Sequence, residues 1–174
     1  VGRLKDGPER VLFEKYRDRF AAAGRRLGFF PVECGEAAES QAVGVDKRRT
    51  DEAAALRRLT RDAETIIALH EAGKACTSAG FAQLLGKIRD GGSKGLAFAI
   101  GGPDGLAADL LAEANHKLSF GAITLPHQLA RIVLVHNETD SRNRSRPARC
   151  THHLEAAHVR AEQKTAFAAR DHVG

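Results

Sequence analysis

The segment from Leu96 to Arg131 constrains the fold of this chain more than any other part of its sequence. It opens with the apolar run LAFAI, residues 96–100, which is typical of a buried parallel strand. The run stops at the glycine-rich sequence GGPDG, residues 101–105, and leucines then recur at helical spacing. This part of the segment therefore predicts a strand, a tight turn and a helix.

The second half of the segment repeats the pattern. A short strand is expected over residues 117–120, and a helix is expected to begin at Thr124-Leu125-Pro126, with Thr124 as its cap and Pro126 in its first turn. Two loops would then leave the same end of adjacent strands. In an open α/β sheet, that end is where ligands bind.

The rest of the chain continues the alternation of helices and strands. The expected elements are a helix from Pro8, an edge strand over 28–33, a mobile loop over 36–49, a helix over 51–59, a central strand over 65–70, a turn at Gly73, and a helix capped by Ser78 and ended by Gly91-Gly92. Such alternation predicts a parallel sheet with right-handed crossovers, which is an α/β fold.

Two motifs carry a closer resemblance. They read IGGPDGL at residues 100–106 and LSFGAITLPHQLAR at residues 118–131. In this order and spacing they closely resemble the RlmH (YbeA) family of SPOUT methyltransferases, whose pattern is IGG-x-x-G-L, a helix, and then LS-x-x-x-(M/L)T-(L/F)-PHQL-x-R. The resemblance implies an α/β-knot fold, in which a Rossmann-like parallel sheet carries a C-terminal trefoil knot.

The resemblance also implies a cofactor and its site. Members of the family bind S-adenosylmethionine largely through backbone groups of loops, and glycines let such groups approach a ligand closely. Carried over position by position, the cofactor-binding residues would be Leu69, Gly101, Phe120, Gly121, Ala122, Ile123, Thr124 and Leu125.

His127 and Arg131 are the candidate catalytic residues. They are four residues apart and therefore share one face of the last helix. In the functional interpretation they line the substrate side of the cofactor, where Arg131 holds a phosphate or the uracil edge and His127 relays a proton. In the structural interpretation His127 caps the helix and Arg131 is solvated. The sequence leaves both interpretations open.

The activity implied by the resemblance is methylation at N3 of a pseudouridine in 23S ribosomal RNA of the assembled ribosome, by a cytoplasmic homodimer. The net charge of +5 favours a polyanionic partner but does not identify one. No apolar run approaches membrane-spanning length. The cysteines share no metal-ligand spacing with each other, and the group Cys150, His152, His153 and His158 is interpreted as coincidence, so no metal site is expected.

The resemblance covers residues 1–135, which we interpret as the SPOUT domain. Val1–Lys5 resembles the end of the family's first strand and the loop after it, so that strand is expected to be incomplete. After Val135 the family pattern stops, and residues 136–174, poor in large apolar side chains, are expected to be an atypical, disordered tail. A reading-frame slip and a lineage-specific tail both explain this change.

Two alternative functions compete with the methyltransferase. One is a degenerate relative with a frame-shifted tail that has lost catalysis. The other is a nucleotide-binding α/β module without transferase activity, which agrees with the alternation of strands and helices but not with the PHQL-x-R motif at residues 126–131. Binding of S-adenosylmethionine separates the methyltransferase from both alternatives.

Overall fold

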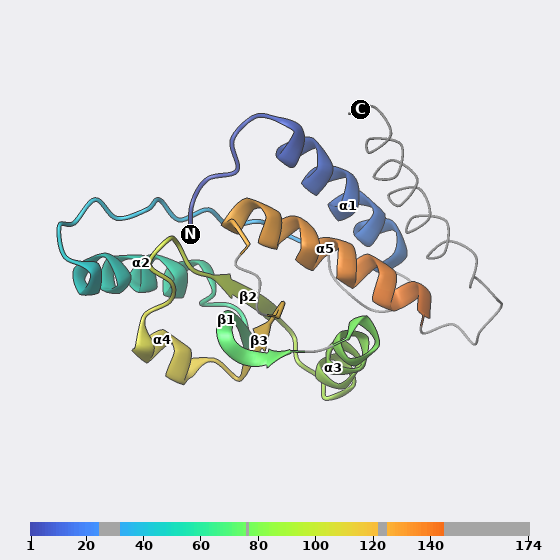
Figure 1. Cartoon of the computed structure of the whole chain (residues 1–174). Helices are drawn as coiled ribbons and strands as arrows, with labels where there is room; N and C mark the ends of the chain where they lie inside the picture. Colours follow the sequence, from blue (N-terminus) through green and yellow to red (C-terminus); the bar gives the residue numbers. More distant parts are fainter. Residues whose placement is uncertain (25–31, 76, 122–124, 145–174) are drawn as a thin grey trace, which may run out of the picture.

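The computed structural model describes residues 1–24, 32–75, 77–121 and 125–144 (Figure 1). Its elements are α1 (Pro8–Gly24), α2 (Val45–Leu59), β1 (Thr65–Ala75), α3 (Ser78–Asp90), β2 (Leu96–Ile100), α4 (Ala108–Glu113), β3 (His116–Ser119) and α5 (His127–Arg144). None of the helices in this described part is long and apolar enough to cross a membrane.

The strands form one parallel sheet in the order β2-β1-β3. Thr65 of β1 lies opposite Leu96 of β2, and Ile67 lies opposite His116 of β3. The α/β class and the parallel sheet are therefore confirmed. The expectation that the two loops leave adjacent strands is wrong, because β1 lies between β2 and β3. The apolar sequence of β1 explains this position, since Ile67 and Ala68 are completely buried.

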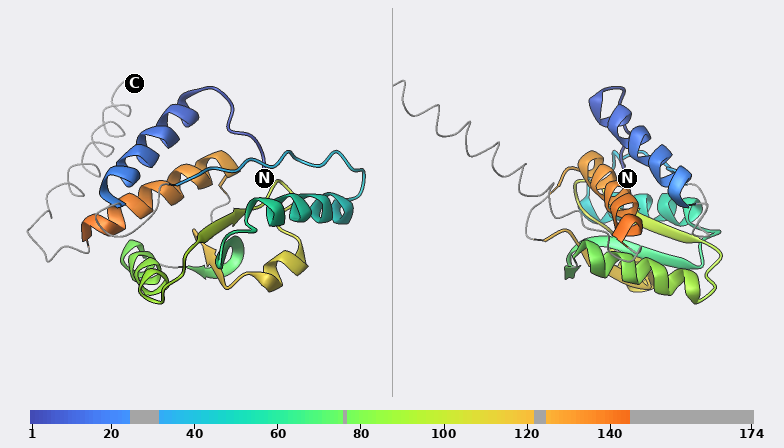
Figure 2. Two further views of the ribbon diagram at one scale, coloured as in Figure 1. Left: turned by 180° about the vertical axis from the view of Figure 1, so that it is seen from behind. Right: turned by 90° about the vertical axis from the view of Figure 1, so that its right-hand side faces the viewer.

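Helices cover both faces of the sheet, because successive side chains of a strand point to opposite faces. Ala68 packs in a cluster with α2 and the start of α4, whereas Ile67 packs with α3 and α5. Helix α1 lies alongside α5 in both views of Figure 2, and the two helices bury Phe13, Phe20, Ile132 and Val135 between them. The carboxyl end of β2 lies near the first residues of the chain (Figure 1), where the Val1 amino group donates to the Ile100 carbonyl.

Strand β1 is longer than expected and contains an irregularity. The central strand was predicted to end at His70, yet β1 continues to Ala75. Its pairing with β3 jumps from Leu69–Leu118 to Lys74–Leu118, so the residues between Leu69 and Lys74 form a bulge. Gly73 allows the bulge, because a Cβ there would lie 2.5 Å from the carbonyl carbon of Leu118.

Gly73→Ala should therefore destabilise the fold. The added methyl group would meet backbone atoms of β3, which cannot rotate away, and we expect a loss of about 2 kcal/mol in the free energy of unfolding. Gly86→Ala is the matched control, since a Cβ at Gly86 has nothing within 4 Å and the helix α3 should gain roughly 0.5–1 kcal/mol. Urea unfolding of both variants checks the contrast, and equal stabilities would contradict this account of the bulge.

Other element boundaries also differ from the sequence predictions. Helix α2 begins at Val45, so the expected loop over 36–49 is shorter; the ion pair of Lys47 with Asp51, one helical turn apart, supports this early start. The cap of α3 is Thr77 rather than Ser78, because the Thr77 side chain accepts the Gly80 N–H at 3.1 Å. Of the expected edge strand, residues 28–31 lie outside the described residues, and residues 32 and 33 belong to no strand.

The last helix also departs from expectation at both ends. It begins at His127, where the Pro126 carbonyl accepts the Ala130 N–H, so Pro126 precedes the helix instead of lying in its first turn; the expected Thr124 cap lies outside the described residues. The expected tail from residue 136 is wrong at its start, because α5 continues to Arg144. Contacts with α1 and α3 explain the extension, since His136 lies against the Tyr16 ring and Asn137 accepts the Ser78 hydroxyl.

Residues 145–174 lie outside the described residues, so their expected disorder stays a prediction. The same holds for the trefoil knot, because residues 122–124 at the entry to the last segment are not described.

Candidate active site

Several predicted cofactor residues meet at the carboxyl edge of the sheet. Leu69 on β1 is paired with Ile100, the last residue of β2, and also with Leu118 near the end of β3. Gly101 follows β2 directly and Phe120 follows β3 directly. The structure therefore brings Leu69, Gly101 and Phe120 to one edge from neighbouring strands.

The glycine turn, residues 101–105, forms one side of this edge. The Gly105 N–H donates to the Gly102 carbonyl at 2.9 Å, and Gly105 has a φ of 82°, which a residue with a side chain adopts only under strain. A Cβ on Gly101 would lie 2.7 Å from the Gly105 carbonyl carbon. The turn is therefore closed tightly enough to require glycine at residue 101.

The loop after β3 forms the other side. Phe120 is exposed although it is a large apolar residue, and Gly121 has a φ of 102°. The Ser119 side chain closes this loop locally, because its Oγ accepts the Gly121 N–H at 3.1 Å. Leu125 is half-buried, while the remaining predicted cofactor residues, Ala122, Ile123 and Thr124, lie outside the described residues.

Arg131 is buried and holds the first residues of the chain. Arg131 as a whole is 5% exposed. Its guanidinium donates to the Gly2 carbonyl at 2.5 Å and to the Val1 carbonyl at 3.3 Å, and lies 3.6 Å from a Glu36 carboxylate oxygen. The interpretation of Arg131 as a solvated side chain is therefore wrong. The residue joins α5 to the N-terminal segment, residues 1–4.

His127 lies against the same segment. A Cβ on Gly2 would be 2.4 Å from the imidazole Nε2, and Gly2 has a φ of 90°, so only glycine is accommodated there without strain. Burial lowers the pKa of His127 below its usual value, and the positive charge of Arg131 lowers it further. At neutral pH the imidazole is therefore uncharged and able to accept a proton.

This lowered pKa predicts a pH dependence of stability. Because the unfolded chain binds a proton at His127 near pH 6.5 and the folded chain binds it at lower pH, the stabilisation is present above pH 6.5 and is lost as the pH falls through the folded-state pKa. His127→Gln should weaken the loss of stability between neutral and acidic pH. NMR titration of His127 and urea unfolding across this range check it, and a pKa above 6.5 would contradict the described burial.

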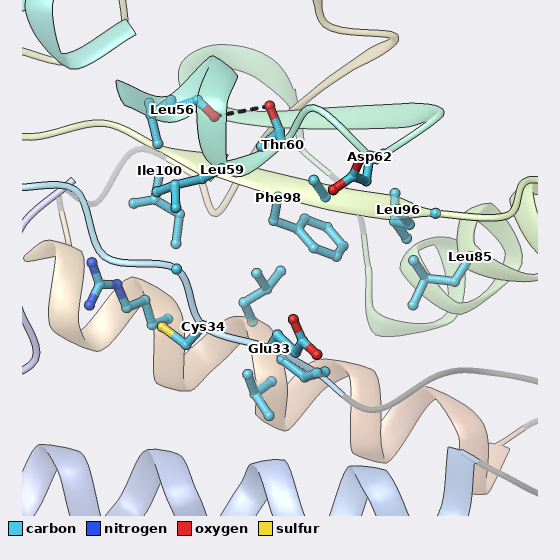
Figure 3. Close-up of a pocket in the computed structure, with 18 of the residues that line it drawn as sticks. Glu33, Cys34, Leu56, Leu59, Thr60, Asp62, Leu85, Leu96, Phe98 and Ile100 are labelled. Atoms are coloured by element: carbon cyan, nitrogen blue, oxygen red, sulfur yellow. Dashed lines mark hydrogen bonds between the residues drawn. The ribbon is translucent and has the colours of Figure 1, made fainter. Parts of the chain in front are cut away.

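A cavity of about 600 Å³ lies beside β2 (Figure 3). It is lined by residues of β2, including Leu96, Phe98 and Ile100, by Leu56 and Leu85 from helices, and by residues 32–35. Among the described residues, Arg131 is the one predicted site residue that lines the cavity, and none of the described cofactor residues lines it. It runs along the outer edge of β2, which has no paired strand among the described residues, and reaches Ile100 at the end of that strand.

The sequence analysis missed several residues around the glycine turn and the N-terminal segment. Glu36 accepts the Leu4 N–H at 2.8 Å and faces Arg131; Glu52 is a buried acid against Gly102; Arg48 and Arg49 bind Asp104. Each lies in a region interpreted as a polar loop or a short helix. A possible signal was the spacing of Arg48 and Glu52, which places both on one face of a helix.

Among the described residues, no group of three or more His, Cys, Asp or Glu side chains is arranged to hold a metal ion.

The architecture and the sequence together define the class of protein. A family model described as a predicted SPOUT methyltransferase matches residues 1–137, which include the sheet, the glycine turn and the first half of α5. The chain is therefore a member of the SPOUT methyltransferase class.

Individual relatives define the family within this class. Ribosomal RNA large subunit methyltransferase H of Rhodopseudomonas palustris (strain HaA2) is 47% identical over 135 residues, which cover 78% of this chain and 84% of that relative. The protein of the same name from Rhizobium meliloti (strain 1021) is 46% identical over 134 residues, covering 77% and 84%. The chain belongs to the ribosomal RNA large subunit methyltransferase H family.

Proposed function

We propose that this chain is an S-adenosylmethionine-dependent methyltransferase of large-subunit ribosomal RNA, acting on N3 of a pseudouridine in 23S ribosomal RNA. The observation that carries the proposal is the meeting of Leu69, Gly101 and Phe120 at one sheet edge in a chain of this family. The names of the relatives support the substrate class. The finer parts of the proposal rest on the resemblance to the family. They are the target atom, N3 of pseudouridine, the assembled ribosome as substrate, the homodimeric state and the cytoplasmic location.

The described residues at this edge suit a nucleoside cofactor. Leu69 and Leu125 are half-buried and Phe120 is exposed, so they offer apolar surface to an adenine ring. Gly101 and Gly121 offer backbone groups that no side chain covers. These residues, together with Ala122, Ile123 and Thr124, would hold S-adenosylmethionine, which supplies an electrophilic methyl group when bound.

His127 and Arg131 would serve the substrate side. A ring nitrogen must lose its proton before it accepts a methyl group, and the uncharged imidazole of His127 is suited to take that proton. Arg131 fixes the N-terminal segment against which His127 rests, and so fixes the position of the imidazole. The chain would therefore contribute position and a proton path.

Calorimetry with S-adenosylmethionine tests the first half of the proposal. Binding at 100 times the dissociation constant should stabilise the fold by about 2.7 kcal/mol, which a thermal shift also reports. The second half is tested by methyl transfer to ribosomes that lack this modification, with free uridine nucleosides as the control. Binding without transfer would favour the degenerate, non-catalytic alternative, and absence of binding would remove the methyltransferase proposal altogether.

A further inference from the structure

The first half of α2 contacts the glycine turn through Arg48, Arg49 and Glu52. None of these residues belongs to the two sequence motifs or to the predicted site. Arg48 and Glu52 are one helical turn apart, and Arg49 follows Arg48, so one stretch of helix presents all three to residues 102–104. This contact is the basis of the inference below.

Arg48 makes the most extensive of these contacts. Its Nε and Nη2 donate to the two carboxylate oxygens of Asp104 at 2.6 and 3.1 Å, and its Nη1 donates to the carbonyls of Ala42 and Val43 at 3.0 Å each. Both partners of the ion pair are about one-quarter exposed. This bidentate geometry fixes both the orientation of the guanidinium and its distance from the carboxylate. The hydrogen bonds from Arg48 hold the pKa of Asp104 below its usual value.

Arg49 binds the backbone of the same turn, and Glu52 packs against it. Arg49 Nε donates to the Asp104 carbonyl at 2.8 Å. Glu52 is 4% exposed, and one of its carboxylate oxygens accepts the Ser40 N–H at 3.1 Å, so this side chain is itself held in place. A Cβ on Gly102 would lie 3.0 Å from the other oxygen, which means that Glu52 packs directly behind the turn.

We propose that Arg48 and Asp104 are positioning residues, and that their ion pair holds the glycine turn in the shape that binds the cofactor. This inference rests on the proposed function, because it assumes that the turn contacts S-adenosylmethionine. Within the turn the Gly105 N–H donates to the Gly102 carbonyl, but Gly101, Gly102 and Gly105 have no side chains to anchor it and Pro103 has no N–H to donate. Asp104 is therefore the side chain through which α2 holds the turn from outside.

The test compares two ion pairs made by the same helix. Arg48→Gln and Asp104→Asn break the pair at the turn. Arg57→Gln breaks the matched pair, in which Arg57 of α2 binds Asp109 and Glu113 of α4 at 2.7–3.0 Å away from the turn. The dissociation constants of S-adenosylmethionine and S-adenosylhomocysteine are measured by calorimetry, and the melting temperature by circular dichroism, for each variant and for the double variant Arg48→Gln/Asp104→Asn.

A positioning role predicts at least a tenfold rise in both dissociation constants for Arg48→Gln and for Asp104→Asn, with Arg57→Gln within twofold of the parent chain. The double variant should bind no more weakly than the weaker single variant, because both changes remove one interaction. Equal affinities of the parent and the Asp104→Asn chain, with or without a lower melting temperature, would overturn the inference and leave the proposed function standing. Failure of the parent chain itself to bind either ligand would overturn both.

Discussion

Replacing Gly101 by valine should abolish cofactor binding and destabilise the fold. A Cβ at this residue would lie 2.7 Å from the Gly105 carbonyl carbon and 2.9 Å from the Leu106 nitrogen, so even alanine would collide with backbone atoms of its own turn. Relieving the collision requires the turn to open. We expect a loss of about 3 kcal/mol in the free energy of unfolding and no detectable binding by calorimetry.

Gly105→Ala provides the control within the same turn. A Cβ at Gly105 has nothing within 4 Å, so this change brings only the strain of a positive φ, about 1–2 kcal/mol. The contrast separates collision from backbone strain. If the Gly101→Val chain bound S-adenosylmethionine as tightly as the parent chain, the glycine turn would not be part of the cofactor site.

Replacing Arg131 by alanine should produce the second large effect, a loss of about 3 kcal/mol in the free energy of unfolding. The change removes the donor to the Val1 and Gly2 carbonyls, leaves Glu36 without its cation, and creates a cavity beside the N-terminal segment. Because His127 rests on Gly2, methyl transfer should fall more than cofactor binding. Urea unfolding, calorimetry and single-turnover methylation measure these three quantities.

Leu129→Ala is the control on the same helix. Leu129 is 41% exposed, so its removal should change the free energy of unfolding by less than about 0.5 kcal/mol. A restored methylation rate in Arg131→Lys would show that the positive charge suffices. An Arg131→Ala chain as stable as the parent would contradict the buried contacts described above.

Local sequence signals predicted the elements whose cause is local. The apolar run at 96–100 forms β2, Pro8 begins α1, and Gly91 ends α3, because strand burial, the fixed φ of proline and helix capping each depend on neighbouring residues. The same reasoning located the carboxyl edge of the sheet. It could not show that β1 separates β2 from β3, since strand order is set by packing across the whole molecule.

The features that sequence reasoning could not predict depend on distant partners. The sequence offers no local reason to bury Arg131, whose carbonyl acceptors lie 129 and 130 positions away. The bulge in β1 likewise depends on the approach of Gly73 to Leu118 on another strand. Helix α2 starts earlier than its apolar pattern indicates. The first residues of this helix are polar, and Arg48 and Arg49 among them bind Asp104 of the glycine turn.

The hydrogen bonds from Arg131 of α5 to the N-terminal segment have a consequence for folding during synthesis. Residues 1–4 are synthesised before their partner Arg131, which lies 129 positions after Gly2. At about 5–20 residues per second, this segment and the α1 side chains Phe13 and Phe20 wait for roughly 5–25 seconds before α5 is synthesised. Phe13 and Phe20 therefore have no α5 partners until the last part of the described chain is made, which makes the docking of α1 on α5 a late step in folding.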